Sequence, residues 1–221
     1  MSDTMRAALD DGNGIVSIHR SPMPERFPGS ALIAMKQIGI CGGDLHMNNE
    51  RTVPQTLPSG HEPAGEVIGV PPGEVRIQPG DRVAIEATGS GKACEACYFC
   101  RTGQYPHCID MAEESGGAFA EYMTRTPLGL HKLSDNMSWE EGALVEPLAV
   151  SVHAVRWGGM QGGDTVAVVG SATIGLAAIA AARALGARKI VASARYPQQK
   201  AMAEACGADL VVGSEPGELE D

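Results

Sequence analysis

Two patterns of apolar residues follow one another along the chain. Up to about residue 150 the apolar runs are short and are broken by Gly and Pro, as in Pro58-Ser59-Gly60 and Pro79-Gly80-Asp81. Short apolar runs between turn residues are typical of strands, and residues 64–70 and 82–85 are examples. We therefore predict a mostly β domain over residues 1–150.

The pattern changes at Ser138, which is followed by Trp139, Glu140 and Glu141. A serine before two acidic residues is typical of a helix N-cap with negative charge in the first turn. The sequence therefore predicts a helical connector that ends at about Gly158.

The rest of the chain alternates apolar runs with helical segments. A strand is predicted at 165–169, then a glycine turn at 170–175 and an Ala-rich helix that ends at Gly186. A second strand at 189–193, a helix at 197–206 and a third strand at 209–212 come next. This βαβαβ order predicts a parallel sheet with right-handed crossovers over residues 151–221.

Composition and charge narrow the class of protein. The chain has 221 residues and a net charge of −10, which argues against nucleic acid or an anionic membrane as a partner. Residues 165–182 carry no charge, but Gly170 and Gly175 interrupt them, so we do not expect a membrane span. The polar start of the chain is unlike a secretory signal, so we expect a cytoplasmic protein.

Four cysteines form a dense cluster: Cys94, Cys97, Cys100 and Cys108, spaced C-x2-C-x2-C-x7-C. Four thiolates this close suit one tetrahedral zinc ion with no open position, which makes the site structural. An iron–sulfur cluster is the alternative, although its usual cysteine spacing differs. Cys206 stands alone and is interpreted as a packed thiol.

Two other segments carry metal-binding side chains. They are Cys41-Gly42-Gly43-Asp44-Leu45-His46 and Gly60-His61-Glu62-Pro63. A thiolate, an imidazole and a carboxylate together are what an open zinc site needs, although each segment alone is a weak indication.

With these segments the sequence resembles the zinc-dependent medium-chain dehydrogenases, the family of alcohol, sorbitol and threonine dehydrogenases. The resemblance rests on residues 39–46, residues 60–65, the four cysteines and Leu144-Val145-Glu146-Pro147-Leu148-Ala149. It implies an α/β protein of two domains. A GroES-like zinc-binding catalytic domain would cover residues 1–150, and an incomplete Rossmann-type dinucleotide-binding domain residues 151–221.

The resemblance also implies roles for individual residues. Cys41, His61 and Glu62 would hold a catalytic zinc. Glu146 would be a fourth ligand, because it stands where alcohol dehydrogenases have a ligand cysteine and sorbitol and threonine dehydrogenases a glutamate. With the structural site this gives two zinc ions per chain. The implied reaction is hydride transfer between an alcohol or polyol and a nicotinamide cofactor, with zinc as a Lewis acid. Asp44 would orient a ligand.

One position departs from the family pattern. Family members usually have Ser or Thr where this chain has Gly43, and that hydroxyl begins the proton relay. Either His46 and water carry the proton, or efficiency or activity has been lost.

The turn at 170–175 resembles the dinucleotide fingerprint G-x-G-x-x-G, with Gly170 and Gly175 in place and Ala172 at the second glycine. It lies between a predicted strand and a predicted helix, so the amides at Ile174 and Gly175 would face a phosphate. The methyl group of Ala172 is expected to weaken pyrophosphate binding.

The cofactor preference is predicted from the residues after this turn. An acid that binds the ribose hydroxyls of NAD is expected about 20 residues on, yet residues 176–203 contain no Asp or Glu. Arg195, with Ser193 and Lys200 as helpers, could bind a 2′-phosphate. The sequence therefore favours NADP over NAD.

The leading hypothesis is thus a zinc-dependent, NADP-linked dehydrogenase with a small alcohol or ketone as substrate. The alternative is a non-catalytic zinc protein that binds nucleotide weakly. Only the first half of a dinucleotide fold is predicted in these 221 residues. We therefore expect weak dinucleotide binding, no turnover by this chain alone, and self-association through an unpaired strand edge. The sequence leaves open whether the protein forms a homo-oligomer.

Overall fold

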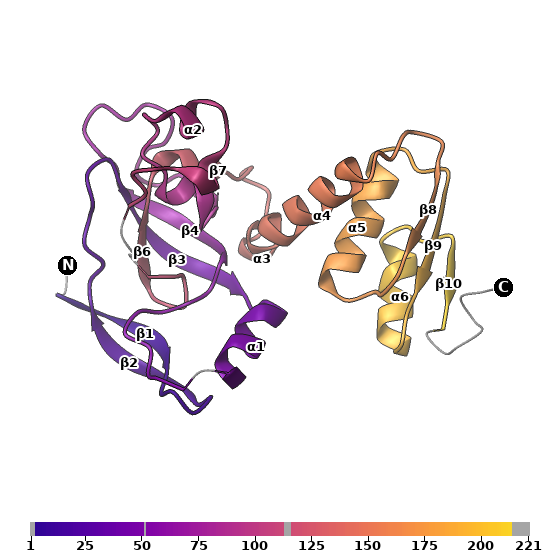
Figure 1. The fold of residues 1–221 in the computed structure, drawn as a ribbon, viewed down its shortest axis with the longest axis horizontal. Helices are drawn as coiled ribbons and strands as arrows, with labels where there is room; N and C mark the ends of the chain where they lie inside the picture. Colours follow the sequence, from indigo (N-terminus) through magenta and orange to yellow (C-terminus); the bar gives the residue numbers. More distant parts are fainter. Residues whose placement is uncertain (1–2, 51, 113–115, 214–221) are drawn as a thin grey trace. The chain divides into compact units, whose positions relative to one another are not determined.

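The computed structural model describes residues 3–50, 52–112 and 116–213, and it divides the chain into two compact units. The first unit is Met1–Glu146 and the second is Pro147–Asp221. Figure 1 shows the elements of both. The predicted domain boundary at 150 falls within helix α4, Val145–Trp157.

The first unit is built on a five-stranded antiparallel sheet and a separate hairpin. The strand order in the sheet is β6-β3-β4-β5-β7, and the hairpin pairs β1 with β2. The strands are β1 Thr4–Asp10, β2 Val16–Pro22, β3 Ala31–Gly39, β4 Glu62–Gly69, β5 Arg82–Ile85, β6 Tyr122–Arg125 and β7 Leu130–Lys132. The predicted strands at 64–70 and 82–85 are confirmed as β4 and β5.

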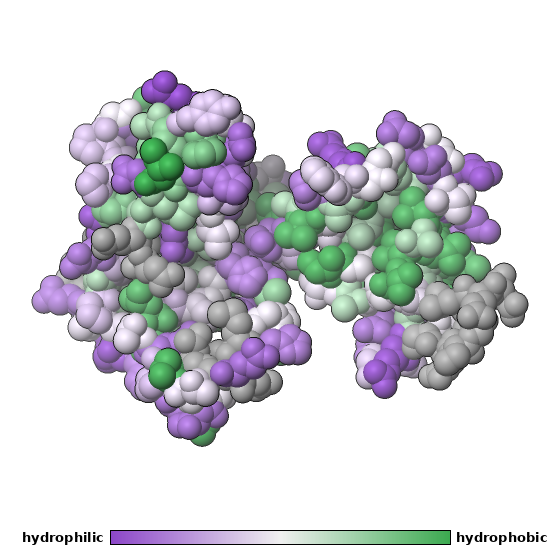
Figure 2. Space-filling model, in the orientation of Figure 1, coloured by the Kyte–Doolittle hydropathy of each residue, from purple (hydrophilic) through white to green (hydrophobic). Residues whose placement is uncertain are grey.

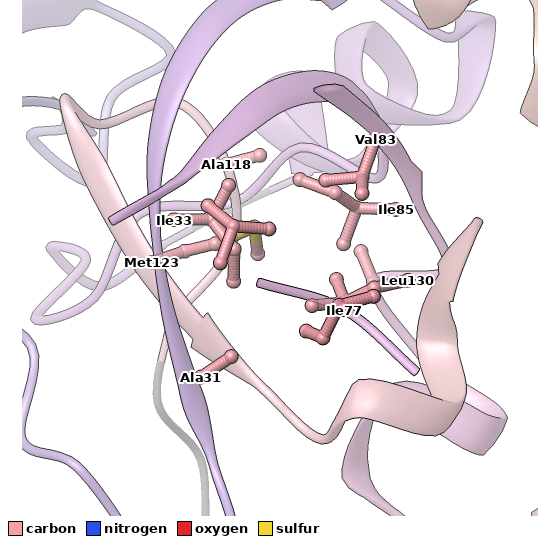
Figure 3. Close-up of a cluster of buried hydrophobic side chains, with 10 residues drawn as sticks. Ala31, Ile33, Ile77, Val83, Ile85, Ala118, Met123 and Leu130 are labelled. Atoms are coloured by element: carbon pink, nitrogen blue, oxygen red, sulfur yellow. The ribbon is translucent and has the colours of Figure 1, made fainter. Parts of the chain in front are cut away.

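A cluster of apolar side chains forms the core of this unit (Figure 3). Ile33 and Met123 lie opposite each other on β3 and β6 and are both fully buried. Val83 and Ile85 come from β5, and Ile77 enters from the segment before it. In Figure 3 these side chains point toward one another, so the sheet curves around a single apolar interior.

Short helices surround this sheet. They are α1 Gly42–Glu50, η1 Gly89–Lys92, α2 Tyr98–Arg101, η2 Tyr105–His107, η3 Pro127–Gly129 and α3 Trp139–Ala143. The sequence did not predict α1, because two glycines begin it and no apolar period runs through it. The segment that follows Cys41 is therefore helical.

Helix α3 begins with the predicted cap. Ser138 Oγ accepts a hydrogen bond from the Glu141 amide at 3.1 Å, and Glu141 Oε2 accepts one from the Ser138 amide at 2.7 Å. Gly142 then lets the helix approach the sheet, since a Cβ there would lie 2.9 Å from Ala64 Cβ on β4. The cap and the missing side chain together dock α3 against β4.

The second unit is a three-stranded parallel sheet in the order β10-β9-β8. Its elements are α4, β8 Thr165–Val168, α5 Thr173–Ala184, β9 Lys189–Ser193, α6 Pro197–Ala205 and β10 Leu210–Val212. The predicted βαβαβ order is confirmed. Ile179 and Ala182 of α5 pack with Ile190 of β9 and Ala203 of α6 in a core of its own.

Strand β8 is an edge strand within the described sheet, because it pairs with β9 alone. The large apolar side chains exposed in this unit include Val169, which follows β8, and Ile174 at the start of α5. Figure 2 shows apolar surface gathered on one face of this unit. No helix in the described part of the chain is long and apolar enough to cross a membrane.

The core of the first unit yields a stability prediction. Replacing Ile33 with Ala should lower the free energy of unfolding by about 2–5 kcal/mol, because it leaves a cavity in a packed interior. Ile18, which is 68% exposed on β2, is the matched control, and Ile18→Ala should change stability little. Urea denaturation of both variants measures the difference, and equal losses would contradict this description of the core.

Candidate metal centres and dinucleotide turn

The four predicted thiols meet in a small lobe formed by residues 89–112, the cysteine lobe. The sulfur atoms of Cys94, Cys97, Cys100 and Cys108 all lie within 4.8 Å of one another. Cys97 Sγ lies 3.5 Å and Cys94 Sγ 3.9 Å from Cys100 Sγ. A tetrahedron with metal–sulfur bonds of about 2.3 Å has edges of about 3.8 Å, so these sulfurs fit a zinc ion.

The surroundings of Cys97 and Cys100 shift the pKa values of their thiols in opposite directions. Hydrogen bonds from backbone amides lower the pKa of the Cys97 thiol to about 6. Burial, together with hydrogen bonds to the neighbouring thiols, raises the pKa of the Cys100 thiol to about 12. A cation that binds all four sulfurs would favour their thiolate forms and so offset the cost of burying Cys100.

Arg76 ties the cysteine lobe to the rest of the first unit. Its guanidinium lies 2.9 Å from Glu95 Oε2 in the lobe and 2.9 Å from Glu74 Oε2 in the loop before β5. The bonds from Arg76 lower the pKa of Glu74 to about 2. This contact was not predictable from the sequence, since charged loop residues are usually solvated and Glu95 has an unusual left-handed backbone, with φ of 60°.

The second group of predicted ligands also comes together. Cys41 lies just beyond the end of β3, and His61 and Glu62 lie at the start of β4. One ligand atom from each of these three residues lies within 4.8 Å of the other two. The antiparallel pairing of β3 with β4 places Gly39 opposite Glu62 and thereby brings the two segments together. A thiol, an imidazole and a carboxyl group fit an open zinc site.

Asp44 connects two members of this cluster. Its Oδ2 accepts a hydrogen bond from the Cys41 amide at 3.0 Å, and its Oδ1 lies 3.7 Å from His61 Nδ1. The Asp44 side chain is buried in the first turn of α1. The buried carboxylate thus restrains the backbone at Cys41 and places a negatively charged oxygen near the imidazole of His61.

Glu146 lies outside the group of three but close enough to interact with it. Burial raises the pKa of the Glu146 carboxyl, and the nearby carboxylates of Glu62 and Glu86 raise it further, while His61 opposes them. Its role as a fourth ligand stays a prediction.

Helix α1 carries both His46, the predicted member of a proton relay, and Gly43, where the relay hydroxyl is missing. His46 is exposed there, and its part in a relay stays a prediction. A Cβ at Gly43 would lie 3.8 Å from Cys41 Sγ and would meet no other described atom within 4 Å. The glycine thus leaves space beside the thiol.

A cleft of about 410 Å³ opens beside Asp44 and His61. The loop at residues 54–60 forms one wall, and Thr88, Lys92 and Arg125 contribute to the others. Arg125 is fully buried and donates to the carbonyl oxygens of Ala87 and Gly116, each at 2.8 Å. These lining residues were not predictable from the sequence, because they come from several loops and form no motif.

The predicted glycine turn joins β8 to α5. Gly170 has φ of 95°, and a Cβ at Gly175 would overlap the carbonyl oxygen of Gly170, so the turn needs both glycines. Ala172 occupies the N-cap position and makes no side-chain hydrogen bond to the helix. Buried Ser151 of α4 donates to the carbonyl oxygen of Ile174 at 3.0 Å and supports this end of α5.

The predicted 2′-phosphate residues lie in different surroundings. Ser193 is buried and accepts a hydrogen bond from the Gly170 amide at 2.9 Å, so its hydroxyl holds the glycine turn in place. Arg195 and Lys200 are exposed, and the Arg195 guanidinium stacks 5.5 Å from the centre of the Tyr196 ring. Contact of Ser193, Arg195 and Lys200 with a cofactor stays a prediction.

Known proteins share the domain and the sequence pattern of this chain. Residues 27–135 match the alcohol dehydrogenase GroES-like domain. The chain is 34% identical to a sorbitol dehydrogenase of Bacillus subtilis in an alignment of 217 residues that covers 94% of this chain and 61% of that protein. The chain thus spans about three fifths of the length of this relative.

Two solved structures are similar over nearly the whole chain. One is 2R,3R-butanediol dehydrogenase from Bacillus subtilis, with a TM-score of 0.77 and 33% identity over 97% of this chain and 64% of that one. The other is a putative zinc-binding dehydrogenase from Sinorhizobium meliloti bound to NADP, with a TM-score of 0.80 and 29% identity over 99% of this chain and 64% of that one. Residues 27–135 thus carry the alcohol dehydrogenase GroES-like domain, and in sequence and fold the chain is similar to alcohol and polyol dehydrogenases.

Proposed function

We propose that this chain contributes the metal-binding part and the adenosine-binding part of a dehydrogenase that transfers hydride between an alcohol or polyol and a nicotinamide cofactor. The observation that carries the proposal is the cluster of Cys41, His61 and Glu62, whose ligand atoms lie within 4.8 Å of one another. The similarity to sorbitol and butanediol dehydrogenases supports a hydroxylated substrate of this class.

The residues around the cluster perform separate tasks in this proposal. Bound zinc would supply Lewis acidity toward a substrate oxygen. Asp44 faces His61 Nδ1 and so leaves Nε2 as the nitrogen for a ligand. Glu146, whose pKa is raised by burial, would gain a counter-charge from a cation bound at the cluster. The cleft beside His61 would admit the substrate, and polar lining residues such as Gln55 and Thr88 suit hydroxyl groups.

We propose NADP as the preferred cofactor. The turn at Gly170 presents the uncapped start of α5, where backbone amides can bind a pyrophosphate. Arg195 follows β9, at the position where a 2′-phosphate would lie, and its side chain is exposed. Similar solved structures hold NADP in one case and NADH in another, so the proposal rests on Arg195 and on the absence of an acid from residues 176–203.

A non-catalytic zinc protein is the second candidate. Gly43 offers no hydroxyl beside Cys41 Sγ, and Ala172 replaces the glycine that lets the backbone approach a pyrophosphate. Such a protein would keep the zinc ion of the cysteine lobe and bind dinucleotide weakly. An assay of NADPH oxidation with a panel of aldehydes and ketones distinguishes the two candidates in the full-length protein.

The chain should bind two zinc ions, one at each cluster. Replacing Cys97 with Ser should remove one zinc and destabilise the cysteine lobe. Among the described residues of the lobe only Ala93 and Cys100 are buried apolar side chains, so metal binding has to stabilise the local fold. Replacing Cys41 with Ser should remove the other zinc with little unfolding. Metal analysis with thermal denaturation measures both effects.

Cys206 provides the control for these two variants, because it lies in neither cluster. Cys206→Ser should keep both zinc ions. If Cys97→Ser or Cys41→Ser retained the full zinc content, the site assigned to that cysteine would be wrong.

Arg195 should determine the cofactor preference. Arg195→Ala should weaken NADPH binding by about 1.5–3 kcal/mol, the range for a hydrogen bond to a charged group, and leave NADH binding nearly unchanged. Arg188, also exposed in this unit, is the control, and Arg188→Ala should leave the binding of both cofactors unchanged. Fluorescence titration measures the affinities, and equal losses for NADPH and NADH would reject the assignment.

Turnover by the 221 residues alone should stay below about 1 s⁻¹, the lower end of ordinary enzyme rates. The reason is that the described parallel sheet contains only β10, β9 and β8, which correspond to the adenosine side of a dinucleotide fold. Steady-state rates with NADPH and a ketone panel test this expectation. Faster turnover would mean that the nicotinamide is held in another way.

A further inference from the structure

Gly39 is the last residue of β3, and it lies directly opposite Glu62, the first residue of β4. In an antiparallel pair the side chains of opposite residues stand on the same face of the sheet. The Glu62 side chain is buried although it carries a carboxyl group. The space over Gly39 therefore accommodates the buried carboxyl group of Glu62.

The glycine leaves that space to Glu62. A Cβ built on Gly39 would overlap Oε2 of Glu62 and would lie 3.0 Å from its Cβ and 3.2 Å from its Cδ. The three atoms nearest to this added carbon all belong to Glu62. Residue 39 thus restricts one side chain in particular, and that side chain belongs to the cluster with Cys41 and His61.

We infer that Gly39 is a positioning residue, which directs the Glu62 carboxylate toward Cys41 and His61 by having no side chain of its own. The inference rests on the proposed zinc ion at this cluster. A methyl group at residue 39 would turn the carboxylate away from the thiol and the imidazole, because the overlapping atom is at the flexible end of Glu62 and moves more easily than the backbone.

The variant Gly39→Ala tests this inference in the 221-residue chain. Zinc affinity is measured by competition with a chromophoric chelator, which resolves the cluster at Cys41 from the four-cysteine site. We expect Gly39→Ala to weaken zinc binding at the Cys41 cluster by about 10–100-fold, the usual effect of disturbing a group that orients a ligand. The four-cysteine site should keep its affinity and so reports that the chain is folded.

Gly42, the residue after Cys41, offers a matched control. A Cβ at Gly42 would meet no described atom within 4 Å, so Gly42→Ala adds the same methyl group beside the same cluster without an overlap. Zinc binding by Gly42→Ala should equal that of the parent chain.

A double variant separates positioning from general damage. In a Glu62→Ala background no carboxylate remains to be displaced, so adding Gly39→Ala should cause no further loss of zinc affinity. A further loss there, unchanged zinc binding in Gly39→Ala alone, or weakening of both zinc sites would each overturn the inference. If the parent chain bound zinc at the four-cysteine site only, the proposed function would fail first, and the inference would fall with it.

Discussion

The pairing of β3 with β4 is the constraint on which the candidate metal site depends. The chain leaves β3 toward Cys41 and enters β4 through His61, so the register that sets Gly39 opposite Glu62 also fixes the separation of a thiol, an imidazole and a carboxyl group. A slip of one residue would turn Glu62 to the other face of the sheet. The apolar core around Ile33 holds this register, because β3 would expose that core if it slipped.

The two metal clusters relate to their surroundings in different ways. The Cys41 cluster lies at the end of a packed sheet, so its geometry is already set by strands and by the buried Asp44. The cysteine lobe buries few apolar side chains, and polar contacts join it to the rest of the first unit, among them the Arg76–Glu95 ion pair and a hydrogen bond from the Thr126 amide to the Gly91 carbonyl oxygen. The lobe therefore depends on its four thiols for stability. Cys41, in contrast, lies on a sheet whose fold is maintained by other contacts.

In the second unit two serine residues, which the glycine fingerprint does not specify, hold the glycine turn in place. Ser193 accepts a hydrogen bond from the Gly170 amide, and Ser171 donates to the Ser193 carbonyl oxygen at 2.8 Å. Both serines are buried. The turn is thus anchored to β9, and the amides at the start of α5 stay available for a ligand.

Local features of this protein were predictable from its amino acids alone. Periodicity and turn residues predicted β4, β5 and the βαβαβ order, and the spacing of four cysteines predicted that their sulfurs would meet. Helix α1 was not predictable, since its glycines give no helical signal, and neither was the Arg76 contact with Glu95. The tertiary structure was needed to establish that Asp44 contacts both Cys41 and His61, and that Glu62 occupies the space above Gly39. Such relations depend on strand register and on which side chain fills which space, and a linear pattern specifies neither.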